Sequence, residues 1–185
     1  MTAADEQQLI LQVKEGSHEA FRILVERYMK MAYNIAYGFM NNHDDADDVA
    51  QESFVKVYES ISSFRGDSTF NTWLYRIVTN HSLNRLRQKK NSNLAKTNLF
   101  NNPIFFSTTQ PAEAGLNESR EIIERTLHEL PTLQRAAVIL RHFNGLSTKQ
   151  VGKILQCSEG TVKTHLHRGL KKMRSKMSFM KDEVV

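Results

Sequence analysis

The segment GLSTKQVGKILQCSEGTVKTHLHRGLKKMR occupies residues 145–174 and carries the clearest structural signal in the chain. Within it, Ser147 is followed three residues later by a glutamine, which is a capping box and predicts a helix at about residues 148–155. A two-residue turn follows, and Ser158 can cap a second helix. Two short helices joined by a tight turn indicate a helix-turn-helix.

The second helix of this motif has an apolar face and a basic face. Apolar residues recur at steps of four, four and three and are expected to face the core: Val162, Leu166, Leu170 and Met173. The opposite face carries phosphate donors and groups that can reach base edges, with no acid: Lys163, Thr164, His167, Arg168 and Lys171. A helix that enters the major groove of DNA needs such a face. An ordinary basic amphipathic helix is the alternative, which the preceding capped helix and turn disfavour.

Helical apolar spacing extends through most of the chain. Its 185 residues include only eight Gly and three Pro, which disfavours a turn-rich β-sandwich. Steps of three and four predict helices at about residues 5–14, 17–40, 45–61, 69–90, 118–129 and 131–143. An asparagine-rich stretch with two prolines lacks this period and is predicted to be a flexible linker. We therefore predict an all-α chain of two small helical domains, residues 1–90 and 118–180, joined by a linker at 91–117, with the helix-turn-helix in the second domain.

The composition excludes several classes of protein. No run of about 18 apolar residues occurs, which argues against a transmembrane helix. The first residues lack the basic and apolar regions of a secretory signal. Cys157 is the only cysteine, so an internal disulfide is impossible and a cysteine-based zinc site is disfavoured. We expect a cytoplasmic protein without metal or cofactor and without direct membrane contact.

Charge is concentrated in three blocks, although the formal net charge is only +5. Residues 41–59 hold six acidic residues against one lysine, whereas residues 65–96 hold seven basic residues against one aspartate. Residues 149–176 hold eight basic residues against one glutamate. Basic blocks suit a polyanion, and an acidic block suits a basic protein partner. Solvated helix faces are the alternative interpretation.

The acidic block lies on the helix predicted at residues 45–61. Asp48, Gln51 and Glu52 share one face of this helix with Glu59, while its apolar residues occupy another. Such a face can bind a basic helical partner. A solvated acidic face explains this segment equally well when it is taken alone.

The next loop and helix combine aromatic, basic and amide side chains. The loop FRGDS at residues 64–68 leads into a helix with one continuous stripe: Trp73, Arg76, Asn80, Asn84 and Arg87. Flat rings stack on bases, arginine pairs with phosphates and asparagine reads base edges. A rigid loop beside such a stripe can hold a flipped base. We expect Phe70 in the core, whereas the pattern leaves Trp73 open between core packing and base stacking.

Three stretches in this order resemble the extracytoplasmic-function (ECF) group of bacterial RNA polymerase sigma factors. They are DVAQESF at 48–54, FRGDS through TWLYRI at 64–77, and GLS through GTVKT at 145–164. The resemblance implies a transcription initiation factor, not an enzyme, which binds core RNA polymerase and directs it to promoter DNA. It implies that the β′ clamp helices contact Asp48, Gln51 and Glu52 and that the second domain binds the β flap. It also implies an anti-sigma factor as a further partner.

The same resemblance assigns DNA contacts residue by residue. It implies contacts to the promoter −10 element, with a non-template base held by the loop from Phe64 to Phe70: Phe64, Arg65, Ser68, Trp73, Arg76, Asn80 and Asn84. It implies contacts to the −35 element from the second domain: Arg141, Lys163, Thr164, His167, Arg168 and Lys171. The pair Trp73-Leu74 replaces the two adjacent tryptophans of housekeeping sigma factors, which implies weaker melting and stricter promoter choice. His167 is an unusual base-reading side chain, so the −35 sequence stays open.

Two other functions remain as alternatives. A free-standing regulator would use the helix-turn-helix alone, but it leaves the acidic helix and the Trp73 region unexplained. An enzyme is the second alternative, because His43-Asp44 resembles the metal-binding pair of HD-type phosphohydrolases. The second histidine–aspartate set of those enzymes is missing, and a dipeptide is a weak signal.

Overall fold

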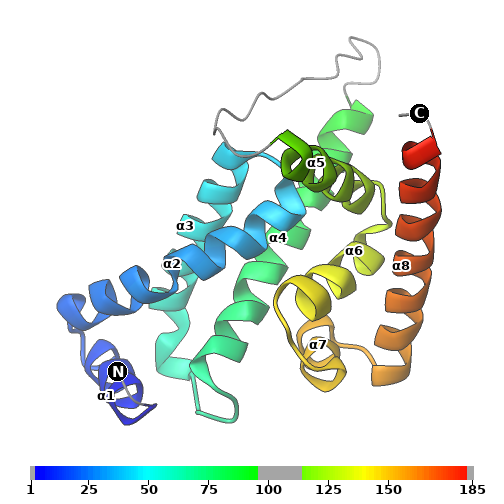
Figure 1. Ribbon diagram of the computed structural model, residues 1–185. Helices are drawn as coiled ribbons and strands as arrows, with labels where there is room; N and C mark the ends of the chain where they lie inside the picture. Colours follow the sequence, from blue (N-terminus) through cyan, green and yellow to red (C-terminus); the bar gives the residue numbers. More distant parts are fainter. Residues whose placement is uncertain (1–2, 96–113, 183–185) are drawn as a thin grey trace.

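The computed structural model describes residues 3–95 and 114–182, and all regular structure within them is helical (Figure 1). The α-helices are α1 (Ala3–Lys14), α2 (His18–Met40), α3 (His43–Ser60), α4 (Phe70–Ala95), α5 (Ala114–His128), α6 (Thr132–Val138), α7 (Thr148–Leu155) and α8 (Glu159–Asp182). A short 3₁₀ helix, η1 (Ile61–Ser63), follows α3, and a π-helical turn, η2 (Ile139–Phe143), follows α6. The predicted all-α class with two helical domains is confirmed.

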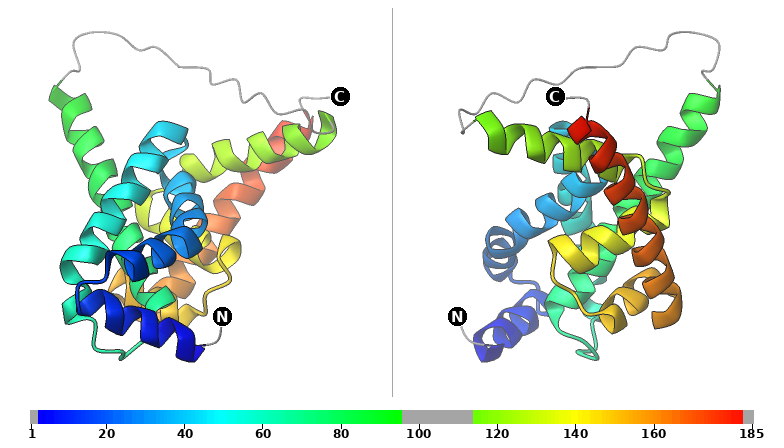
Figure 2. Two further views of the ribbon diagram at one scale, coloured as in Figure 1. Left: turned by 90° about the vertical axis from the view of Figure 1, so that its left-hand side faces the viewer. Right: turned by 45° about the vertical axis from the view of Figure 1, so that its right-hand side comes forward.

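Helices α2, α3 and α4 pack together and form the core of the first domain (Figures 1 and 2). Ser17 caps α2 by accepting a hydrogen bond from the Ala20 amide at 3.2 Å. Asn42 caps α3 by accepting from the Asp45 amide at 2.9 Å. These caps satisfy backbone donors that a helix start leaves unpaired. The interior between the three helices is apolar and almost fully buried: Leu24, Ile35, Phe39, Val49, Val57, Phe70, Leu74 and Val78.

The helix boundaries around the predicted linker differ from the sequence expectation. Helix α4 continues to Ala95 instead of ending near residue 90, and α5 begins at Ala114 instead of residue 118. The remainder of the linker prediction, residues 96–113, lies outside the described residues. Polar residues occur in exposed helical turns as well as in loops, so the loss of apolar periodicity placed the predicted boundary too early.

The helix predicted at residues 131–143 forms as α6 followed directly by the π-helical turn η2. The Asn144 amide bonds to the Ile139 carbonyl at 3.1 Å, and the Asn144 side-chain amide donates to the same oxygen at 2.9 Å. The Ile139 carbonyl oxygen therefore accepts two hydrogen bonds from Asn144, one from its backbone and one from its side chain, at the point where the helix ends. Gly145 follows with a φ of 69°, which fits its predicted position at a helix end.

The helix-turn-helix consists of α7 and the start of α8. Both hydrogen bonds of the predicted capping box between Ser147 and Gln150 are present. A β-carbon on Gly152 would lie 2.8 Å from the Cys157 carbonyl oxygen, so only glycine lets the turn close this tightly. Ser158 then accepts a hydrogen bond from the Thr161 amide at 3.1 Å and caps α8 as predicted.

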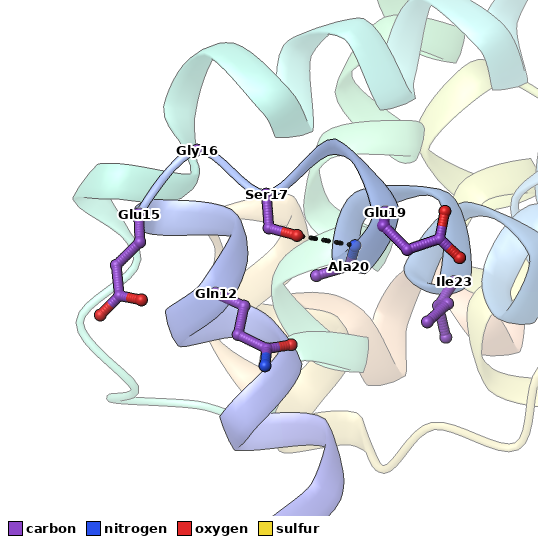
Figure 3. A pocket seen from close by; sticks show the side chains of 7 residues that line it. All are labelled: Gln12, Glu15, Gly16, Ser17, Glu19, Ala20 and Ile23. Atoms are coloured by element: carbon purple, nitrogen blue, oxygen red, sulfur yellow. Dashed lines mark hydrogen bonds between the residues drawn. The ribbon is translucent and has the colours of Figure 1, made fainter.

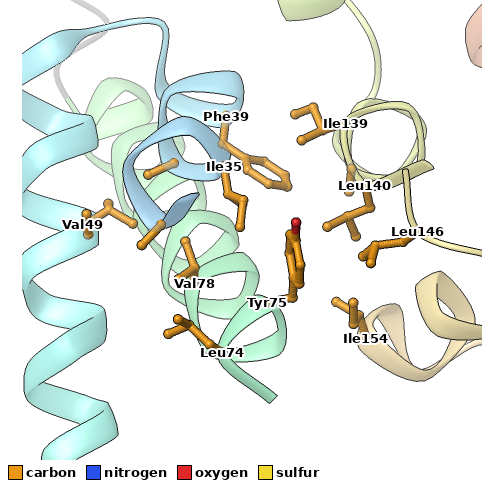
Figure 4. Close-up of a cluster of buried hydrophobic side chains, with 14 of the residues drawn as sticks. Ile35, Phe39, Val49, Leu74, Tyr75, Val78, Ile139, Leu140, Leu146 and Ile154 are labelled. Carbon is orange, nitrogen blue, oxygen red and sulfur yellow. The ribbon is translucent and has the colours of Figure 1, made fainter. Parts of the chain in front are cut away.

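The two domains pack against each other through an apolar interface that the sequence pattern left open. Figure 4 shows Tyr75 of α4 between the side chains of the first domain and those of the second. The second domain contributes the buried residues Ile139, Leu140, Leu146 and Ile154. Gly38 allows a close approach, because a β-carbon there would lie 3.3 Å from Ile139. Burial of each large apolar side chain stabilises the folded chain by about 1.5–3 kcal/mol, so this contact is substantial.

A partly buried arginine adds a polar link across the same boundary. Nη1 of Arg135 donates to the Phe39 carbonyl oxygen at 3.1 Å and lies 3.2 Å from Nδ1 of His128. Burial, together with the charge of Arg135, lowers the pKa of His128 to about 4. His128 is therefore neutral at pH 7 and can accept the hydrogen bond from the guanidinium.

Candidate nucleic-acid interface

The predicted amide-and-aromatic stripe of α4 lines a cavity of about 260 Å³ next to the end of α3. Four of the predicted −10 residues meet there: Trp73, Arg76, Asn80 and Asn84. The lining also includes Lys56 and Ser60 of α3, Ser63 of η1, and Ile77 and His81 of α4. A ring, two cations and two amides around one opening offer stacking, phosphate pairing and base-edge hydrogen bonds.

Trp73 belongs to both the core and the cavity. Its ring centroid lies 5.1 Å from that of Phe64 and 5.8 Å from that of Phe70, in tilted arrangements. Phe70 is 1% exposed, which confirms its predicted place in the core. The half-buried Trp73 thus packs against the core and also lines the cavity. Packing holds the ring in place, which reduces the entropy that base stacking would cost.

The loop that precedes α4 is held in place by contacts of its first residue, Phe64. Nζ of Lys14 donates to the Phe64 carbonyl oxygen at 2.6 Å, and Phe64 packs edge-on against Phe70. Arg65 is exposed, and Gly66 adopts a φ of 79°, which few other residues tolerate. Ser68 is half-buried, with its hydroxyl 3.3 Å from the Thr69 carbonyl oxygen. Arg65 and Ser68 therefore lie in a short loop between Phe64 and Phe70, whose rings pack together.

All five predicted residues of α8 are exposed, and their face is opposite the buried one. Val162, Leu166 and Met173 are no more than 8% exposed, as the spacing predicts. The prediction was wrong for Leu170, which is 36% exposed. Gly169 packs against α6 in its place, because a β-carbon on Gly169 would lie only 3.1 Å from Val138. The close approach of backbones turns Leu170 to the edge of the interface.

The exposed side chains of this face are Lys163, Thr164, His167, Arg168 and Lys171. The hydroxyl of Thr164 donates to the Gly160 carbonyl oxygen at 3.0 Å. Arg141 is also exposed and sits in the π-helical turn before the helix-turn-helix. Several cations on one helix face, without an acid among them, match the phosphate-rich surface of duplex DNA.

The acidic residues of α3 are less isolated than the sequence suggested. Asp48 and Glu52 have side chains that are 57% and 54% exposed, yet both lie within 4.0 Å of Arg85 on α4. Gln51 is exposed and donates to Asp47 at 2.7 Å. The sequence pattern did not single out Arg85. The signal for it is a basic residue at every fourth position, beside the amide-and-aromatic stripe: His81, Arg85 and Lys89.

A second cavity, of about 550 Å³, lies between α1 and α2 (Figure 3). Its lining includes the carboxylates of Glu15 and Glu19 and the capping hydroxyl of Ser17. No aromatic or basic side chain is among its lining residues. Its chemistry therefore does not suit a nucleic acid.

Comparisons with known proteins agree with both halves of this geometry. The family model of sigma-70 region 2 matches residues 24–92, and that of sigma-70 region 4 matches residues 120–173. The ECF RNA polymerase sigma factor SigW of Bacillus subtilis is 34% identical over 176 residues, which cover 91% of this chain and 94% of SigW. This chain belongs to the ECF group of RNA polymerase sigma factors. Like other members, the sigma factor directs RNA polymerase to promoters and is not an enzyme.

Two further proteins are similar to this sigma factor along most of its length. The RNA polymerase sigma-H factor of Pseudomonas aeruginosa is 33% identical over 176 residues, with 91% of each chain covered. The solved structure of the sigma factor RpoE from Bartonella quintana, in complex with the anti-sigma factor NepR, gives a TM-score of 0.71 at 22% identity. That match covers 85% of this chain and 96% of the other, and it supports the fold.

The family membership decides between the alternatives left open by the sequence. A free-standing regulator does not account for region 2, whereas a sigma factor contains it together with region 4. His43, the first residue of the His43-Asp44 pair, stacks on the Tyr33 ring and packs against the Tyr37 ring in a tilted arrangement. In the part of the chain that the structure describes, no group of three or more His, Cys, Asp and Glu residues could hold a metal ion. No helix in residues 3–95 and 114–182 is long and apolar enough to cross a membrane.

Proposed function

We propose that this sigma factor binds the −10 element in the cavity beside α4 and the −35 element along α8. The main support for this proposal is that one cavity is lined by Trp73, Arg76, Asn80 and Asn84. A base that leaves the duplex can stack on the Trp73 ring, while the two amides offer donors and acceptors to base edges. Phe64, Arg65 and Ser68, in the loop before α4, add further contacts to the same strand, and Phe64 packs against Trp73.

For the −35 element, α8 enters the major groove of the duplex. Lys163, Arg168 and Lys171 pair with phosphates, while Thr164 and His167 reach base edges. Arg141 adds a phosphate contact from the π-helical turn. Because each phosphate contact releases counterions, binding weakens steeply with salt.

Core RNA polymerase docks on α3 and on region 4. On α3, Asp48, Gln51 and Glu52 receive the β′ clamp helices, and region 4 receives the β flap. Val55, which is 60% exposed on α3, lies one turn from Glu52 and supplies an apolar contact within this polar surface. Polymerase supplies the chemistry, whereas the sigma factor supplies promoter choice and strand separation.

The proposed domains are region 2 at residues 1–90 and region 4 at residues 118–180, with a connecting segment at 91–117. Separation of the two domains would expose their shared apolar interface and allow each to reach its own element. An anti-sigma factor is a fitting partner, because the similar RpoE of Bartonella quintana is bound to one. Since its polymerase partner is cytoplasmic, we assign the sigma factor to the cytoplasm.

Transcription from a promoter library tests this function. Core RNA polymerase without a sigma factor is mixed with this protein and random promoter DNA, and the run-off transcripts are sequenced. Starts that cluster behind two short motifs are the expected result. Absence of initiation, together with specific duplex binding by the protein alone, would contradict the proposal and favour a free-standing regulator.

A further inference from the structure

A ladder of ion pairs joins α3 to α4 directly beside the cavity. The basic side chains of α4 recur every fourth residue and share one stripe, and three carboxylates of α3 face them at steps of three and four. The six members, called here the α3–α4 ladder, are Asp45, Asp48, Glu52, His81, Arg85 and Lys89.

Arg85 stands at the centre of the α3–α4 ladder. Its Nη2 atom lies 3.3 Å from Oδ2 of Asp48 and 3.9 Å from Oδ1 of Asp45, and its Nη1 atom lies 4.0 Å from Oε1 of Glu52. The Arg85 side chain is 31% exposed, whereas those of Asp48 and Glu52 are more than half exposed. The carboxylates therefore keep acceptor sites open to a second cation while they restrain the arginine.

The ladder and the cavity share a residue. His81 lines the cavity, and its Nδ1 atom lies 3.9 Å from Oε2 of Glu52. Asn80 and Asn84, which also line the cavity, directly precede His81 and Arg85 in the sequence. A single strand that leaves the cavity along α4 can therefore reach Arg85. In the free chain that guanidinium already pairs with carboxylates.

We propose that the α3–α4 ladder couples polymerase docking to single-strand binding, and this inference rests on the function proposed above. In the free chain, Asp48 and Glu52 hold Arg85 and weaken its attraction for phosphates. When basic side chains of polymerase pair with these two carboxylates, Arg85 becomes available to bind phosphates of the strand. Such coupling is reciprocal, so strand binding in turn tightens polymerase binding.

The first test uses the free full-length chain and a fluorescent oligodeoxythymidine strand, with binding followed by anisotropy. The double variant Asp48→Asn, Glu52→Gln removes two of the three carboxylates near Arg85 without polymerase. Because an exposed ion pair alters an equilibrium only modestly, we expect binding about two- to tenfold tighter. The slope of log affinity against log salt should steepen by about 0.7 for each phosphate gained.

A matched control removes two acids that pair with a different arginine. Glu19 and Glu26 contact Arg22 on α2 at 2.6 and 2.5 Å, and their side chains, like those of Asp48 and Glu52, are more than half exposed. The variant Glu19→Gln, Glu26→Gln changes the net charge by the same amount but leaves the ladder intact, so its affinity for the strand should increase less. Equal gains in the two double variants, or a gain that persists after Arg85→Gln is added, would overturn the proposal.

The second test repeats the measurement with core polymerase bound. Arg85→Gln should lower strand affinity about two- to fivefold in the complex and little in the free chain, where Arg85 is already paired. The same loss in both states would refute the coupling. Failure of the wild-type chain to bind core polymerase refutes the proposed function instead, while the first test still decides whether the carboxylates restrain Arg85.

Discussion

Acid should destabilise the second domain through one histidine. Burial and the neighbouring Arg135 lower the pKa of His128 to about 4 in the folded chain, whereas an unfolded histidine titrates near 6.5. Between these values the unfolded chain binds more protons, so the stabilisation is complete above about pH 6.5 and is lost as the pH falls towards 4. Between pH 7.5 and pH 5 this single group costs about 2 kcal/mol of unfolding free energy.

The variant His128→Gln isolates this effect. Its side-chain oxygen can still accept a hydrogen bond from Arg135, but it does not titrate. We would measure urea unfolding of both proteins by circular dichroism at pH 7.5 and pH 5. The wild type should lose about 2 kcal/mol more than the variant, because all other titrating groups are common to both. An equal loss in the two proteins would refute the assignment of a partly buried, neutral His128.

Three substitutions test other parts of the structure. Gly152→Ala places a β-carbon 2.8 Å from the Cys157 carbonyl oxygen, so it should lower Tm by several degrees and abolish −35 duplex binding. Gly160→Ala is the control, because the nearest atom to its β-carbon is 3.7 Å away. Equal Tm and equal duplex binding of the two variants would count against the turn geometry. Gly38→Val should clash with Ile139 and separate the two domains, which would enlarge the radius of gyration in small-angle X-ray scattering. An unchanged radius of gyration would show that the interface accommodates the larger side chain. Trp73→Ala should weaken binding of a −10 single strand by about 1–3 kcal/mol and Trp73→Phe by less, and no loss would place Trp73 outside the DNA site.

Local signals predicted the helices and their caps well. Ser147 with Gln150 and Ser158 each predicted a helix start that the structure contains, because a cap depends only on residues within one turn. The stripe from Trp73 to Asn84 also follows from helical spacing alone, and the structure gathers its members around one cavity. Such features can be read from sequence because their geometry is set inside one element.

Features that depend on contacts between elements could not be predicted in this way. The exposure of Leu170 follows from the approach of Gly169 to Val138, which periodicity along α8 does not contain. The pairing of Asp48 with Arg85 spans 37 positions in the sequence. Likewise, the contact of Tyr75 with the second domain needs the packing of α4 against α7, which no local pattern specifies.

The most direct test of the two-element proposal separates the contributions of the two domains. Random promoter DNA is transcribed by core polymerase with the wild-type chain, with an α8 variant carrying His167→Ala and Arg168→Ala, and with an α4 variant carrying Asn80→Ala and Asn84→Ala. We predict that the α8 variant loses sequence preference only in the upstream motif, and the α4 variant only in the downstream motif. Loss of both preferences in either variant, or of neither, would contradict the claim that each domain reads its own element.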